Sequence, residues 1–327
     1  MNLRFEFDRY TAIKVAEYLQ TSGMAQKAAD MWYGICAADP YERMPREKFG
    51  ELTYDLRQAN SAKGTVERSR FILRVIALSY PTKKLAEAYF DNLTRLLAAR
   101  PKRDRPGQVV LGLGAGRCGS TTLAAALGSV EGALATHENP CGIFWQPETA
   151  QLQFHWRRFR MLAERYALAF DAAHWWLPAV DAFFTEFPEG KAIGLLREPT
   201  SCARSFLSVK GQGTGSLNHW APKANGIWAT SPGDPTYPTL PLPPGAVADP
   251  DGAKAQMVED YLRQYNARLK ELAVQFPDRL LLIHTEDLNR PETAASLSAF
   301  LGHDVRLPER ALNAGGTADS DRHEMTY

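Results

Sequence analysis

Residues 108–127 read QVVLGLGAGRCGSTTLAAAL, and this stretch decides the fold. Its first part is apolar and β-branched and predicts a buried strand over 109–111, whereas the Ala- and Leu-rich residues 121–127 predict the first turns of a helix. A glycine-rich turn lies between them. Such a turn lets successive backbone N–H groups surround an anion at the start of a helix. The stretch therefore predicts a phosphate-binding loop in an α/β domain.

The turn also carries the side chains that a phosphate requires. The predicted phosphate-binding residues are Gly114, Gly116, Arg117, Cys118, Gly119, Ser120 and Thr121. In nucleoside triphosphatases the pattern GxxxxGK[ST] places a lysine directly before the serine or threonine, where it reaches the β- and γ-phosphates beside Mg²⁺. Here Gly119 precedes Ser120, and the cation is Arg117, two residues earlier. The loop thus departs from an ordinary ATP-binding loop, and a strand–turn–helix unit without a ligand is the alternative.

Net charge and cysteine content indicate which kinds of partner and which compartment to expect. The 327 residues are enough for one or two domains, and a formal net charge of +1 gives no general attraction to nucleic acid or acidic membranes. The first residues contain no apolar leader, and no apolar run approaches membrane-spanning length. Four cysteines without metal-binding spacing, Cys36, Cys118, Cys141 and Cys202, are typical of free thiols. We therefore expect a cytoplasmic protein.

Residues 1–101 are helical in pattern and are predicted to form a separate domain. Residues 25–40, AQKAADMWYGICAADP, carry alanines at helical spacing, end in a proline, and resemble the second helix of a tetratricopeptide unit. The other predicted helices span 11–19, 49–56, 66–80 and 85–99. Either degenerate repeats or a plain helical extension of the next domain explains this pattern. In both cases we expect the region to bind a protein partner or to support the second domain.

A basic, proline-bounded linker over 100–106 leads into a second predicted domain, residues 102–327. Strands are predicted at 191–196 and 279–283, and helices at 151–169, 179–187, 200–209, 253–276 and 291–301. Alternating strands and helices indicate an α/β fold with three layers and a mainly parallel sheet. An insertion over 210–252 is rich in Pro, Gly, Ser and Thr. We expect it to be a loop that covers the substrate, with disorder as the alternative.

A second anion-binding segment is predicted at the end of the strand 191–196. Arg197 follows this strand directly, at the edge of a parallel sheet where ligands bind. Ser205 lies eight residues later, within the next predicted helix. A guanidinium and a hydroxyl so placed are able to hold one phosphate between them.

Three separated segments together resemble a known family. GAGRCGSTTL (114–123), LLREPTSCARSFL (195–207) and HTEDL (284–288) resemble, in order and spacing, the signature segments of sulfotransferases that use 3′-phosphoadenylyl sulfate. The resemblance covers roughly residues 107–302. It implies that the first segment binds the 5′-phosphosulfate and that Arg197 and Ser205 bind the 3′-phosphate. It also implies adenosine 3′,5′-bisphosphate as the product and no metal ion.

The resemblance has two departures. Cys118, within the predicted nucleotide-binding loop, stands where the family usually has a serine, so one hydroxyl donor is lost; we expect a change in affinity rather than loss of binding. The family's late Arg-Lys-Gly phosphate segment has no secure match, and Arg310 and Arg322 are its only candidate substitutes.

Sulfuryl transfer to an alcohol needs donors on the sulfonate and a base for the hydroxyl proton. Arg117 and the amides of residues 119–121 are the expected donors. Glu138 lies 21 residues after Arg117, a spacing like that of the catalytic glutamate in tyrosylprotein and several carbohydrate and bacterial sulfotransferases. His174 lies 23 residues before Arg197, similar to the catalytic histidine of cytosolic small-molecule sulfotransferases. We favour Glu138 as the base, with His174 as the alternative and His137 as a third candidate.

The acceptor is expected to be a small molecule or a carbohydrate. Six tryptophans near the predicted site suit a flat or sugar-like surface, although ordinary core packing also explains them: Trp145, Trp156, Trp175, Trp176, Trp220 and Trp228. Two other functions stay open. One is an NTP-dependent kinase or ATPase, and the other is a non-catalytic helical scaffold that carries an inactive sulfotransferase-like domain.

Overall fold

A computed structural model of the chain describes residues 15–20, 27–28, 31–32, 83–138, 143–210, 219–222, 227–230, 234 and 236–308. The chain divides into two compact units. One comprises Met1–Ala99, Thr214–Ala221 and Thr230–Pro235, and the other comprises Arg100–Gly213, Pro222–Ala229 and Thr236–Tyr327.

The first unit contributes one long described helix, α5 (Lys83–Leu97), close to the predicted 85–99. Its buried side chains include Phe90, Leu93 and Leu97, which follow each other at helical spacing. The helical hairpins predicted over 11–80 lie almost entirely outside the described residues.

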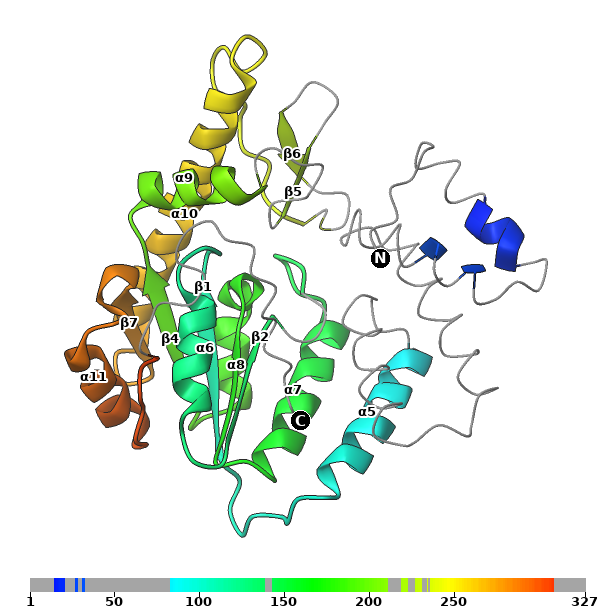
Figure 1. The fold of residues 1–327 in the computed structure, drawn as a ribbon, viewed down its shortest axis with the longest axis vertical. Coiled ribbons are helices and arrows are strands. Elements are labelled where there is room, and N and C mark those ends of the chain that lie inside the picture. Colours follow the sequence, from blue (N-terminus) through cyan, green and yellow to red (C-terminus); the bar gives the residue numbers. More distant parts are fainter. Residues whose placement is uncertain are drawn as a thin grey trace. The chain divides into compact units, whose positions relative to one another are not determined.

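The second unit is built on a five-stranded sheet. Its strands are β1 (Gln108–Gly114), β2 (Ala133–His137), β3 (Leu168–Ala172), β4 (Lys191–Leu196) and β7 (Leu280–His284), in the order β2-β3-β1-β4-β7 (Figure 1). Every neighbouring pair in this sheet is parallel. β1 and β3 are almost completely buried, as expected for central strands with apolar residues on both faces. The predicted α/β class with a parallel sheet is confirmed.

Helices connect the parallel strands, as such a sheet requires. The connecting helices are α6 (Ser120–Gly128), α7 (Thr149–Ala163), α8 (Val180–Glu186), α9 (Pro199–Lys210) and α10 (Pro250–Gln275), with the short 3-10 helix η1 (His174–Ala179). The 3-10 helix η2 (Thr285–Asp287) and helix α11 (Pro291–Leu301) follow the last strand. α6 packs on β1, β2 and β3, whereas α10 packs on β4, β7 and α9 (Figure 1). No helix in the described part of the chain is both long and apolar enough to cross a membrane.

One predicted element was wrong in its extent. The helix predicted over 151–169 ends at Ala163, and Leu168 already begins β3. Leu, Ala and Phe in 168–172 suit a helix as well as a buried strand, so a short apolar run does not decide between them. Pairing decides, because Leu168 lies between Gln108 of β1 and Ala133 of β2. β2, which was not predicted, completes this side of the sheet.

The insertion predicted over 210–252 contains some regular structure. Strands β5 (Trp220–Pro222) and β6 (Trp228–Thr230) form a separate two-stranded sheet. Asp249 then caps α10, because its side chain accepts a hydrogen bond from the N–H of Gly252 at 2.9 Å.

Several of the tryptophans belong to the core. Trp156 and Trp176 stack on each other with ring centroids 6.2 Å apart, and Phe159, Phe183 and Phe187 surround them. Trp156 and Trp176 are both buried. The alternative of core packing therefore holds for these two tryptophans.

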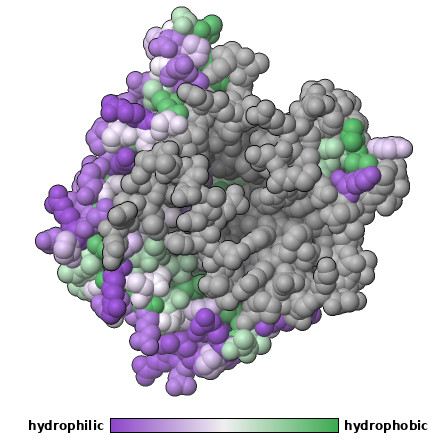
Figure 2. All heavy atoms as spheres, viewed as in Figure 1, coloured by the Kyte–Doolittle hydropathy of each residue, from purple (hydrophilic) through white to green (hydrophobic). Residues whose placement is uncertain are grey.

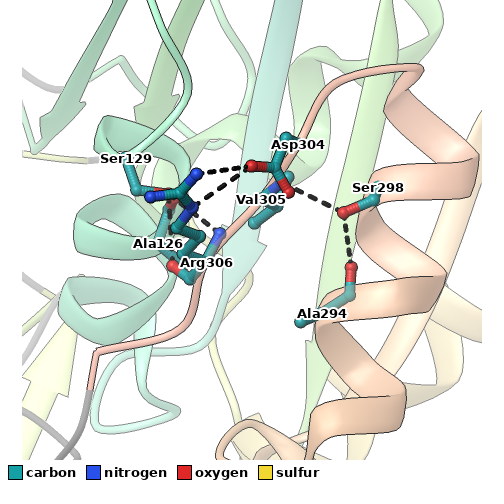
Figure 3. Close-up of polar contacts among 7 residues, drawn as sticks. All are labelled: Ala126, Ser129, Ala294, Ser298, Asp304, Val305 and Arg306. Atoms are coloured by element: carbon teal, nitrogen blue, oxygen red, sulfur yellow. Dashed lines mark hydrogen bonds and ion pairs between the residues drawn. The ribbon is translucent and has the colours of Figure 1, made fainter.

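The last described segment is tied to the end of α6 (Figure 3). The Ser129 hydroxyl donates to the carbonyl of Ala126 at 2.6 Å and accepts from the backbone N–H of Arg306 at 2.9 Å. The N–H of Val305 donates to the Ser298 hydroxyl of α11 at 3.0 Å. These bonds hold the chain after α11 against the carboxyl end of α6.

The segment predicted as a linker, 100–106, is exposed and contains no helix or strand. Figure 2 shows hydrophilic side chains gathered along the lower edge of the view, where this segment runs.

Candidate active site

The glycine-rich turn joins β1 to α6 as predicted. Gly116 and Gly119 have φ of 81° and 84°, a conformation that glycine adopts without strain. A Cβ atom on Gly119 would also lie 2.5 Å from Cδ1 of Leu288. Gly119 is therefore required both by its backbone conformation and by the side chain packed on it. Its position as the N-cap of α6 leaves the first amides of that helix available to an anion.

Backbone strain coincides with two of the predicted catalytic residues. Among the described residues, Arg117 and Glu138 are the non-glycine residues with positive φ, at 52° and 53°. Such conformations cost roughly 1–3 kcal/mol each and persist where surrounding structure imposes them, often at functional sites. The N–H of Glu138 is held by a 2.9 Å bond to the carbonyl of Ala172. The fold thus fixes both residues in strained positions.

The two predicted anion-binding segments meet. β4 pairs with β1, so Arg197, which follows β4, emerges beside the glycine-rich turn. The Arg197 guanidinium donates to the carbonyl of Arg117. Arg117 in turn donates from Nε to the Ser205 hydroxyl of α9 at 3.4 Å. Arg117, Arg197 and Ser205, predicted from separate motifs, therefore form one connected group.

The two alternative bases also lie together. β2 and β3 are neighbours with His137 opposite Ala172, so Glu138 and His174 leave the sheet side by side. Nδ1 of His174 is 3.8 Å from Oε1 of Glu138. The His174 side chain is only 3% exposed, whereas that of Glu138 is 44% exposed. Glu138 is the member of the pair that solvent is able to reach.

His137 connects this pair to the turn. Nε2 of His137 lies 2.8 Å from the Ser120 hydroxyl, at the first residue of α6. His137, the third candidate for the base, thus contacts Ser120, which is predicted to donate a hydrogen bond to phosphate.

Cys118 does not direct its side chain as a serine donor would. Its thiol is buried and donates to the carbonyl of Gly116 at 3.1 Å, and the Cys202 thiol of α9 donates to the same carbonyl at 3.5 Å. The neighbouring thiol of Cys202, together with burial, raises the pKa of Cys118. The neighbouring thiol of Cys118 lowers the pKa of Cys202, helped by the charges of Arg197 and Arg117. Cys118 therefore contributes its backbone to the turn, while its side chain packs inward.

The remaining predicted residues fall on the same elements. Gly114 ends β1 opposite Leu195 of β4, and Thr121 lies in the first turn of α6. Arg310 and Arg322, the candidate substitutes for a late phosphate segment, lie outside the described residues. Within the described part of the chain, no group of three or more His, Cys, Asp and Glu side chains is placed to hold a metal ion.

Sequence reasoning missed the residues of α10 that support the site. The Tyr265 hydroxyl donates to the carbonyl of His174 at 3.0 Å, and the Asn266 amide donates to the carbonyl of Arg197 at 2.8 Å. Burial raises the pKa of Tyr265 well above its ordinary value, which keeps this hydroxyl a donor. By its spacing Tyr265 falls on the apolar face of α10, which indicates packing and not a role in the site, and no local motif marks Asn266.

Comparisons with known proteins find similarity in structure and not in sequence. No family model matches the sequence, and no curated protein matches it. Among solved structures, the chain is similar to a sulfotransferase from Alicyclobacillus acidocaldarius, with a TM-score of 0.38 and 16% identity over 61% of this chain and 82% of that chain. This degree of similarity supports no functional inference.

Proposed function

We propose that the chain is a sulfotransferase that moves a sulfuryl group from 3′-phosphoadenylyl sulfate to a hydroxyl or amine of an acceptor. The observation that carries this proposal is the connected group of Arg117, Arg197 and Ser205 at the carboxyl ends of β1 and β4. Two guanidinium groups and a hydroxyl, next to the amino end of α6, suit a ligand with several anionic groups. The absence of a lysine before Ser120 suits a donor without a γ-phosphate.

Each end of the nucleotide has its own set of residues. Arg117, Ser120 and the amides at the start of α6 bind the 5′-phosphosulfate, and Arg197 and Ser205 bind the 3′-phosphate. As the acceptor oxygen attacks sulfur, the bond between sulfur and the 5′-phosphate oxygen breaks. Arg117 and the amides stabilise the charge that develops on the leaving phosphate.

Glu138 accepts the proton of the acceptor hydroxyl. Its exposure, its strained backbone and its position beside the turn support this role. His174, 3.8 Å away and buried, is then the partner of the carboxylate and not the group that touches the acceptor. The acceptor is a small molecule or carbohydrate that enters over the exposed carboxylate.

Calorimetric titration with adenosine 3′,5′-bisphosphate, beside ATP with Mg²⁺, tests the proposal without knowledge of the acceptor. We expect the bisphosphate to bind and Arg197→Ala to weaken it about tenfold or more, because a charged fork to a phosphate is lost. Arg204→Ala is the matched control, since Arg204 lies on α9 but is exposed. Tight ATP binding with turnover would favour the kinase, and no binding of either nucleotide would favour the scaffold.

A further inference from the structure

The third motif, residues 284–288, holds no part of the nucleotide in the proposed function. It begins where β7 ends at His284, and η2 follows at once. The Thr285 side chain turns from this segment toward the site. Its Oγ1 lies 2.9 Å from the carbonyl oxygen of Cys118 and 3.1 Å from that of Leu196.

These two carbonyls belong to the two anion-binding segments. Cys118 lies in the glycine-rich turn, directly after Arg117, and Leu196 ends β4, directly before Arg197. A hydroxyl has one hydrogen, so Thr285 shares it between the two carbonyls. One side chain thereby links the peptide group between Leu196 and Arg197 to the peptide group between Cys118 and Gly119, one residue beyond Arg117.

The segment that carries Thr285 is itself held in place. Leu288 is buried against Gly119, where an added Cβ atom would lie 2.5 Å from its Cδ1, and the N–H of Leu288 donates to the carbonyl of Thr285 at 3.2 Å. The Thr293 hydroxyl of α11 donates to the carbonyl of Asp287 at 2.6 Å. Thr285 therefore acts from a fixed turn, and not from a loose surface position.

We propose that Thr285 is a positioning residue that fixes the separation between the glycine-rich turn and the end of β4. A fixed separation favours a ligand that carries anionic groups at both ends, because binding at one end then places the other at its pocket without further ordering. A ligand with one anionic group gains nothing from it. This inference rests on the proposed function and adds the reason why both pockets act on one nucleotide.

Thr285→Val and Thr285→Ser test the proposal in the full chain. Valine keeps the shape and removes the hydroxyl, whereas serine keeps the hydroxyl. Calorimetry compares adenosine 3′,5′-bisphosphate, which spans both pockets, with adenosine 5′-monophosphate and adenosine 3′-monophosphate, which each fill one. We expect Thr285→Val to weaken the bisphosphate about tenfold and each monophosphate less than about twofold, and Thr285→Ser to bind all three within about twofold of wild type.

The outcomes separate this inference from the function. A wild-type chain that does not bind the bisphosphate overturns both. A wild-type chain that binds it, with Thr285→Val weakening all three ligands equally or none of them, overturns only the role of Thr285.

Coupling to Arg197 gives a second readout that general loss of stability does not move. In an Arg197→Ala background, Thr285→Val should weaken the bisphosphate less than about twofold, because the pocket that it positions has already lost its cation. Full additivity of the two effects would overturn the proposal.

Discussion

Two residues of this site adopt a strained backbone conformation. Arg117 and Glu138 both have positive φ, and each lies shortly after the end of a parallel strand, Arg117 after β1 and Glu138 after β2. The sequence alone indicated both residues, through motif and spacing, but left Glu138 and His174 as alternatives. Their contact depends on β2 lying next to β3, and β2 was not recognised. The sequence therefore identified the two candidate side chains, but it did not predict the strand pairing that brings them together.

Glu138→Gln tests the assignment of the base. We expect sulfuryl transfer to fall by about 10²–10⁴-fold, since the amide cannot take the proton, while affinity for adenosine 3′,5′-bisphosphate changes less than about twofold. The measurement is transfer from labelled donor to an acceptor found by screening. Unchanged turnover in Glu138→Gln, with a loss of several orders of magnitude in His174→Ala, would reverse the two roles.

Tyr265 gives a prediction about alkaline pH. Because burial raises the pKa of Tyr265 in the folded chain, the unfolded chain loses this proton first as pH rises through about 10. The unfolded state then binds fewer protons, so the free energy of unfolding falls as pH rises. Tyr265→Phe removes this part of the fall in unfolding free energy, and it also removes the hydrogen bond from the Tyr265 hydroxyl to the carbonyl of His174.

Denaturant unfolding at several pH values measures the effect of Tyr265→Phe. At neutral pH the variant should be less stable than wild type by about 1 kcal/mol, and the difference should narrow between about pH 9 and 11. The raised pKa of Cys118 and the lowered pKa of Cys202 act with opposite signs on the stability of both proteins, so only the difference between the proteins is informative. A difference that stays constant with pH would contradict the prediction.

At the scale of elements, helix α10 is the support of the site. Neighbouring residues on it, Tyr265 and Asn266, hold the carbonyls of His174 and Arg197. The long apolar stripe of this helix was predictable from its period, and so were β1, α6 and β4 from their apolar runs and glycines. The end of α7 was not predictable, because residues 164–169 contain no glycine or proline that would separate a helix from a strand. The hydrogen bonds from α10 to the site were not predictable either, because they depend on long-range packing.

Gly119→Ala tests how the turn and η2 fit together. We expect a loss of about 1–3 kcal/mol in unfolding free energy, from positive φ and from the clash with Leu288, together with loss of bisphosphate binding. Gly128→Ala, at the end of α6, is the control, because a Cβ there meets its nearest neighbour at 3.7 Å and its φ is not positive. Adding Leu288→Ala to Gly119→Ala should restore part of the stability but leave the strain in φ. Equal effects of the two glycine substitutions would contradict this account.

At the scale of the whole molecule, all five strands of the sheet deliver a group to the same edge. The turn follows β1, Glu138 follows β2, His174 comes shortly after β3, Arg197 follows β4, and Thr285 follows β7. In a parallel sheet the carboxyl ends of all strands lie at one edge, which makes this convergence possible. The chain brings these distant groups together through its topology.

Ligand-induced stabilisation tests the site in the context of the two compact units. Adenosine 3′,5′-bisphosphate at a hundredfold excess over its dissociation constant should stabilise the unit that binds it by about 2.7 kcal/mol. If the units melt separately, calorimetry should show that only the transition of the unit containing the sheet shifts. A shift of both transitions, or of neither, would argue against a site confined to that unit.

The strand order also places the proposed base and the proposed nucleotide-binding residues on different strands of the sheet. Glu138 and His174 follow β2 and β3, whereas the residues proposed to bind the nucleotide follow β1 and β4. Under the proposed function, substitutions that flank Glu138 and His174 but leave both in place change which acceptor is modified, while Arg117, Arg197 and Ser205 hold the donor as before. New acceptor specificities are therefore accessible to selection or engineering without rebuilding the half of the site that all such reactions share.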